Sequence, residues 1–115
     1  LNLSRKPHLK YYSSDRISQY LGNGSCIFVD KNSQLEDLFT KDEVIFFETD
    51  DLADFGKKIS YYISNQDETR RIAKNGWERG HKFYNEKIVT NYFLEIAFKN
   101  KPDSDYGWPI HQYFR

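Results

Sequence analysis

The 115 residues include no methionine, a single cysteine and no long hydrophobic run. One cysteine excludes an internal disulfide, and with only three histidines it argues against a structural zinc site. No apolar run approaches the roughly 20 residues that a membrane-spanning helix needs. The formal net charge is zero, so the chain lacks the surplus of lysine and arginine typical of nucleic-acid-binding proteins. We predict no nucleic-acid partner, no transmembrane segment, no metal ion and no cofactor.

The missing methionine also bears on the start of the chain. The first residues, Leu1, Asn2 and Leu3, form neither an initiator nor a signal peptide with a charged start and an apolar stretch. We therefore expect the carboxy-terminal piece of a longer protein, with its amino-terminal part missing. The absence of a signal and the lone cysteine favour a cytoplasmic location.

Aromatic residues make up 17% of the chain, which argues against disorder and predicts one folded domain. Helix-start and helix-stop residues bracket a helix at 15–21, which ends at the glycines of 22–24. Continuous apolar runs at 26–29 and 44–47 predict strands buried on both faces, with a short helical turn at 35–39 between them. Apolar residues at helical spacing then predict three helices, at 52–63 with Thr49 or Asp50 as its cap, at 67–83, and after the cap Asn85. The apolar face of the last helix would consist of Ile88, Val89, Tyr92, Phe93, Ile96 and Ala97.

This order predicts an α/β fold, as a partial Rossmann-like layer of two or three parallel strands with about four to five helices. Residues 1–3 would form the end of a further strand. We assign residues 1–100 to the folded domain and residues 101–115 to an aromatic tail that packs across a surface. In the helix at 67–83, Gly76 and Gly80 indicate close approach of another element, because glycine costs about 1 kcal/mol inside a helix.

The strongest candidate site is the start of the first helix. The amino end of a helix carries unpaired N–H donors and a partial positive charge, and it binds phosphate readily. The backbone donors of Ser13, Ser14, Asp15 and Arg16 would be joined by the serine hydroxyls and by the guanidinium group. Gln19, one turn further along, would reach a sugar hydroxyl. An ordinary capped helix with a solvated arginine would show the same pattern.

Three other residues are weaker candidates. Asp30 follows a predicted strand, where open α/β sheets bind ligands, although an aspartate there more often caps the next turn. His81 lies in a helix near aromatic residues, which favours a packed or surface histidine over a catalytic base. Cys26 lies in a predicted buried strand, which favours an inert core thiol.

An ordered set of short segments resembles a known family. The segments 16–24 (RISQYLGNG), 26–30 (CIFVD), 35–39 (LEDLF) and 43–47 (EVIFF) resemble the carboxy-terminal part of GT-B-fold glycosyltransferases. The segments 71–76 (RIAKNG) and 81–84 (HKFY) match the tail of the same family. The similarity covers residues 1–98, and it is strongest to the glycosyltransferase-1-like family that includes spore-maturation-type proteins.

The resemblance implies that residues 1–100 are part of the half that binds a nucleotide-diphosphate sugar. The helix start at 13–16 would then face the diphosphate, with Arg5 as a second phosphate contact. Gln19 stands where the family often has a glutamate that holds the ribose hydroxyls. The half that binds the acceptor and supplies the base is missing, so the chain alone should not be a competent transferase.

Two functional hypotheses follow. In the first, the chain is the donor-binding portion of a glycosyltransferase. In the second, it is a non-catalytic binding or assembly module that forms a homodimer through its truncated sheet, because exposed sheet edges and aromatic side chains favour protein contacts.

Overall fold

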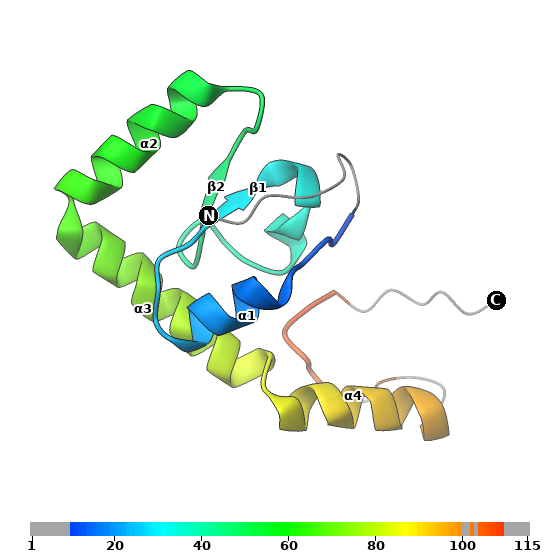
Figure 1. Ribbon diagram of the computed structural model, residues 1–115. Helices are drawn as coiled ribbons and strands as arrows, with labels where there is room; N and C mark the ends of the chain where they lie inside the picture. Colours follow the sequence, from blue (N-terminus) through cyan, green and yellow to red (C-terminus); the bar gives the residue numbers. More distant parts are fainter. Residues whose placement is uncertain (1–9, 100–101, 103, 110–115) are drawn as a thin grey trace.

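The structure is a computed structural model that describes residues 10–99, 102 and 104–109. Over these residues the fold is mixed α/β, with four α-helices and a two-stranded parallel sheet (Figure 1). The predicted fold class is therefore confirmed. Arg5 and the strand expected at residues 1–3 lie outside the described residues.

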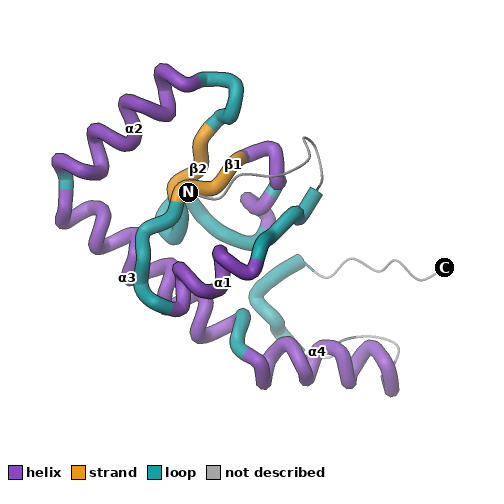
Figure 2. The backbone as a smooth tube through the Cα atoms, viewed as in Figure 1, coloured by secondary structure: helices purple, strands orange, loops and turns teal. Residues whose placement is uncertain are grey.

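The elements follow the predicted order, as the tube in Figure 2 shows. The chain forms, in turn, α1 (Asp15–Gly22), β1 (Phe28–Asp30), two 3-10 helices (Lys31–Ser33 and Leu35–Asp37), β2 (Ile45–Phe47), α2 (Leu52–Ser64), α3 (Gln66–Phe83) and α4 (Glu86–Lys99).

The sheet is covered on both faces, as the apolar runs predicted. Phe28 pairs with Ile45 and Asp30 with Phe47 in a parallel register. Because side chains alternate along a strand, these four share one face, where the Phe55 ring of α2 lies 5.8 Å from the Phe28 ring and 4.6 Å from the Phe47 ring. The other face belongs to the core cluster of Ile17, Leu21, Ile27, Val29, Leu35, Phe39 and Val44.

The helix caps explain where the helices begin. Asp51 caps α2, because its Oδ1 accepts a hydrogen bond of 2.8 Å from the N–H of Asp54; the cap expected at residues 49–50 was therefore displaced by one residue. Asn85 caps α4 as predicted, with its Oδ1 accepting from the N–H groups of Lys87 and Ile88 at 3.0 and 3.1 Å.

Close approach of α1 and α3 sets the position of the site. A Cβ atom on Gly76 would lie 2.5 Å from the carbonyl oxygen of Glu43 and 2.8 Å from Cδ2 of Leu21. A Cβ atom on Gly80 would meet nothing nearer than Cβ of Leu21, at 3.7 Å. The small-residue prediction is thus confirmed at Gly76, whereas Gly80 has room for a methyl group.

The apolar face predicted for α4 was partly wrong. Phe93, assigned to its apolar side, is 65% exposed, whereas the carboxylate of Glu95 is buried. Hydrogen bonds explain this burial: Glu95 accepts from the hydroxyls of Tyr106 and Ser104 at 2.7 and 3.1 Å. Tyr106 is itself buried, so residues of the C-terminal segment cover part of α4.

Candidate functional site

The amino end of α1 lies beside the loop that follows β1. Ser14 occupies the N-cap position with extended backbone angles, and its carbonyl accepts a hydrogen bond of 3.0 Å from the N–H of Ile17. Just before the helix, the N–H of Tyr11 donates to the carbonyl of Ser33 at 2.8 Å, and the Tyr11 hydroxyl donates to Asp37 at 2.6 Å. These bonds hold the helix start next to the carboxyl end of a parallel strand, where α/β sheets bind ligands.

The predicted site residues lie on different sides of α1. Ser13 lines a pocket on the side of the helix that faces the α3–α4 junction, whereas Ser14, Asp15, Arg16 and Gln19 do not line it. Arg16 and Gln19, three residues apart, are both exposed. Within the part of the chain that the structure describes, Arg16 forms no ion pair, so its guanidinium group is available to an anion.

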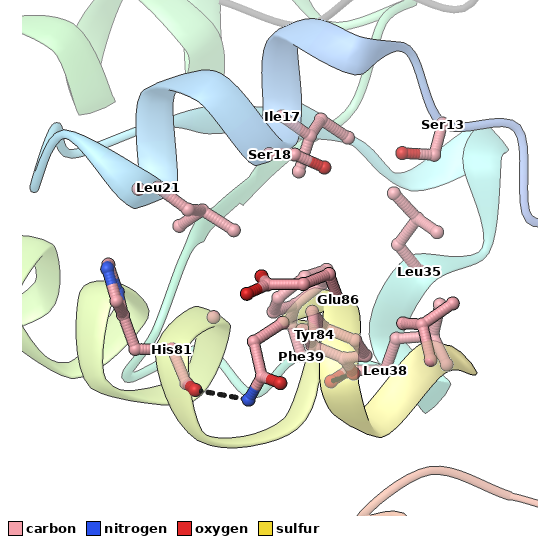
Figure 3. Close-up of a pocket in the computed structure, with 14 residues that line it drawn as sticks. Ser13, Ile17, Ser18, Leu21, Leu35, Leu38, Phe39, His81, Tyr84 and Glu86 are labelled. Carbon is pink, nitrogen blue, oxygen red and sulfur yellow. Dashed lines mark hydrogen bonds between the residues drawn. The ribbon is translucent and has the colours of Figure 1, made fainter. Parts of the chain in front are cut away.

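The pocket has a volume of about 410 Å³ and lies between α1, the segment 35–39 and the α3–α4 junction (Figure 3). Its apolar walls are formed mainly by Ile17, Leu21, Leu35, Leu38, Phe39 and Val89. These walls come from segments far apart in the sequence, and their inner members, Ile17, Leu21, Leu35 and Phe39, also belong to the buried core.

Polar residues line the pocket from its two sides. Ser18 lies in α1 and Ser13 lies two residues before this helix. On the opposite side are His81 near the end of α3, Asn85, and Glu86 at the start of α4. In Figure 3 the Glu86 carboxylate points into the space between the two sides. Asn85, between the two helices, donates a hydrogen bond of 2.8 Å from Nδ2 to the carbonyl of His81, which ties the end of α3 to the start of α4 (Figure 3).

Hydrogen bonding fixes the tautomer of neutral His81. Its Nδ1 lies 3.0 Å from the carbonyl oxygen of Trp77, which can only accept a hydrogen bond. The proton of the neutral ring is therefore on Nδ1, and Nε2 is left as an acceptor. Sequence reasoning had placed His81 among packed or surface residues, and it gave Glu86 no role at all, because only the fold brings both opposite α1.

Tyr84 forms a rigid wall of the pocket. Its hydroxyl donates to the carbonyl of Leu38 at 2.8 Å, its ring centroid lies 5.2 Å from that of Phe39, and Trp108 stacks on it at 5.6 Å. Burial of the phenol raises the pKa of Tyr84 above its ordinary value. The C-terminal segment therefore helps to hold one wall of the pocket in place.

A second hollow, of about 310 Å³, lies around Arg79. The guanidinium group donates to the carbonyls of Leu38, at 3.1 Å, and of Gly107, and it packs 4.5 Å from the Phe83 ring. Its Nε, 3.9 Å from a carboxylate oxygen of Glu43, is buried without a hydrogen bond. These contacts join three segments of the chain, so Arg79 stabilises the packing of these segments against one another.

Asp30 has a structural role, whereas the buried strand position predicted for Cys26 was wrong, because Cys26 is half-buried and precedes β1. Asp30 is buried, and its Oδ1 accepts from the N–H of Asn32 at 2.9 Å, so it caps the first 3-10 helix. Partial burial raises the pKa of the Cys26 thiol. In the described ranges, no group of three metal-ligating side chains comes together, and no helix is long and apolar enough to cross a membrane.

Comparison with known proteins adds one finding. Residues 1–94 match the model of the glycosyl transferase-like family, which covers most of the chain. The chain belongs to the glycosyl transferase-like family. No curated protein and no solved structure matches it. Membership of this family implies a sugar donor, and neither a particular donor nor a particular acceptor follows from the match. The predicted resemblance to a glycosyltransferase family is therefore confirmed for the family itself.

Proposed function

We propose that the chain is the donor-binding portion of a glycosyltransferase, which moves a sugar from a nucleotide-diphosphate sugar to an acceptor. The observation that carries the proposal is Arg16, which forms no ion pair with the described residues, at the amino end of α1, beside the loop after β1, in a member of this family. A helix amino end and a guanidinium group both favour the charge of a diphosphate.

In this proposal the diphosphate lies against residues 13–16, with Arg5 as a further contact, and Gln19 contacts the ribose. During transfer, the bond between the sugar carbon and the phosphate oxygen breaks, and the acceptor oxygen forms the new bond. The leaving diphosphate gains negative charge, which the helix end and Arg16 stabilise without moving. A further, amino-terminal half would bind the acceptor and take its proton, so we expect the chain alone to bind the donor without transferring it.

Calorimetric titration with UDP, GDP and their sugars tests this proposal. We expect at least one nucleotide to bind, and the substitution Arg16→Ala to weaken it about tenfold, the effect of losing charge-assisted hydrogen bonds. Arg70→Ala is the matched control, because Arg70 is exposed on α3 and, among the described residues, pairs with Asp67 of the same helix at 3.4 Å. Binding of none of these nucleotides at millimolar concentration by the folded chain would refute the proposal.

A second candidate is a non-catalytic assembly module that forms a homodimer. The described sheet has two strands, so each strand has a hydrogen-bonded neighbour on one side only. On α4, Phe93, Leu94 and Phe98 are 65%, 50% and 82% exposed. Light scattering that shows a dimer unaffected by Arg16→Ala, in a chain that binds no nucleotide, would favour this candidate over the first.

A further inference from the structure

The chain contains two asparagines that precede a glycine, Asn23 and Asn75. An asparagine in this position can lose its side-chain amide, because the backbone nitrogen of the next residue can attack the side-chain carbonyl carbon. Glycine favours the attack, since it has no Cβ to obstruct the approach and its backbone turns freely. Asn23 directly follows α1, whereas Asn75 lies inside α3, so the fold gives the two asparagines different surroundings.

Asn23, the C-cap residue of α1, and Gly24 lie in an exposed turn. Gly24 has a φ of 70°, in the left-handed region that glycine adopts readily, and its N–H donates to the carbonyl of Leu21 at 2.9 Å. Nδ2 of Asn23 donates to the carbonyl of Gln19 at 2.8 Å. Both hydrogen bonds must open before the nitrogen of Gly24 can reach Cγ of Asn23.

Opening of that turn disturbs little of the structure. Residues 22–25 are all exposed, so no buried side chain leaves the core when they move. Two further hydrogen bonds of the turn are local as well, because the N–H groups of Asn23 and Ser25 donate to carbonyls in the last turn of α1, at 3.1 and 2.9 Å. The end of an eight-residue helix opens locally far more often than the whole chain unfolds, so Asn23 can react in the folded protein.

The second asparagine is held in place by the packing of α3. Gly76, which follows it, is buried in the middle of this helix, and a Cβ atom there would lie 2.5 Å from the carbonyl oxygen of Glu43, so the backbone has no room to turn. Nδ2 of Asn75 donates to the carbonyl of Asp42, in the loop before β2, at 3.0 Å. Attack on Asn75 would require α3 to unwind and to separate from this loop, which needs nearly the full free energy of unfolding.

We propose that Asn23 is the site at which the folded chain deamidates, and that this modification loosens the carboxyl end of α1. Hydroxide removes the N–H proton of Gly24, and the nitrogen forms a bond to Cγ of Asn23. The bond from Cγ to Nδ2 then breaks, and ammonia leaves after taking a proton from water, which regenerates hydroxide. Water opens the resulting cyclic imide at either carbonyl and leaves an aspartate or an isoaspartate. The reaction consumes water alone, so it is independent of donor binding.

The product differs from asparagine at the point where α1 ends. A carboxylate cannot donate a hydrogen bond, so the bond from Nδ2 of Asn23 to the carbonyl of Gln19 is lost. Its negative charge also lies at the carboxyl end of α1, where the helix dipole is negative. The N–H groups of residues 23–25 all donate to carbonyls of α1. We expect their hydrogen exchange to become about tenfold faster, the effect of losing one hydrogen bond and adding an unfavourable dipole contact.

Peptide mass spectrometry of the 115-residue chain, kept folded in mildly alkaline buffer, tests the site. We expect Asn23 to be converted at least about tenfold faster than Asn75, and urea to bring the two rates close together, because unfolding removes the difference in their surroundings. Asn23→Gln should block the reaction without adding charge, and the matched control Asn75→Gln should leave conversion of Asn23 unchanged. Equal conversion of the two asparagines in the folded chain, or no conversion of Asn23, would overturn the proposal.

The substitution Asn23→Asp introduces the aspartate product directly and tests its effect on α1. Hydrogen exchange of residues 23–25, followed by nuclear magnetic resonance, should be about tenfold faster than in the parent chain. Asn23→Ala removes the hydrogen bond without adding charge, so its exchange rates should fall between those of the other two chains. Exchange in Asn23→Asp that matches the parent chain would refute the loosening of α1.

Discussion

The substitution Gly76→Ala should destabilise the fold, although alanine is the better helix former. A methyl group at this position would lie 2.5 Å from the backbone oxygen of Glu43 and 2.8 Å from Leu21. A backbone oxygen cannot rotate away, so the cost should be near the upper end of the roughly 1–3 kcal/mol typical of overpacking. The helix propensity of alanine returns about 1 kcal/mol. We expect a net loss of about 2 kcal/mol in the free energy of unfolding, or roughly 10 °C in the melting temperature.

Gly80→Ala is the control on the same face of the same helix. Its methyl group would meet Cβ of Leu21 at 3.7 Å, an ordinary contact, so the propensity gain should remain and stabilise the chain by about 0.5–1 kcal/mol. Urea unfolding followed by far-ultraviolet circular dichroism measures both effects. The comparison holds if the dependence of the unfolding free energy on urea concentration is the same for both variants as for the parent chain. A Gly76→Ala chain as stable as its parent, or equal destabilisation by both substitutions, would refute the packing argument.

Two further predictions concern titratable side chains. Because burial raises the pKa of Cys26, iodoacetamide at pH 8 should alkylate the folded chain more slowly than the urea-unfolded chain, and equal rates would contradict this. Burial also raises the pKa of Tyr84 above its ordinary value of 10.0, so the folded state favours the protonated phenol. This contribution to the free energy of unfolding is complete below about pH 10 and is lost as the pH rises through the folded-state pKa. Urea unfolding at increasing pH should therefore show a steeper loss of stability for the parent chain than for Tyr84→Phe.

Local signals predicted the helices well. The first helix was expected at 15–21 and spans Asp15–Gly22, and the third was expected at 67–83 and spans Gln66–Phe83. Capping residues and glycines act within one turn of a helix end, so the sequence alone contains that information. The strand bounds were predicted less accurately. An apolar run such as 26–29 indicates which residues are buried, whereas the bounds of β1, Phe28–Asp30, are set by its hydrogen-bonded pairing with β2.

The pocket could not be predicted from local patterns. Its two sides carry Ser18 and Glu86, which are far apart in the sequence, and no spacing rule connects them. Likewise, no sequence pattern indicated a buried carboxylate at Glu95, and its burial depends on hydrogen bonds from Ser104 and Tyr106. Such contacts depend on how helices and the C-terminal segment meet, which helical periodicity does not encode.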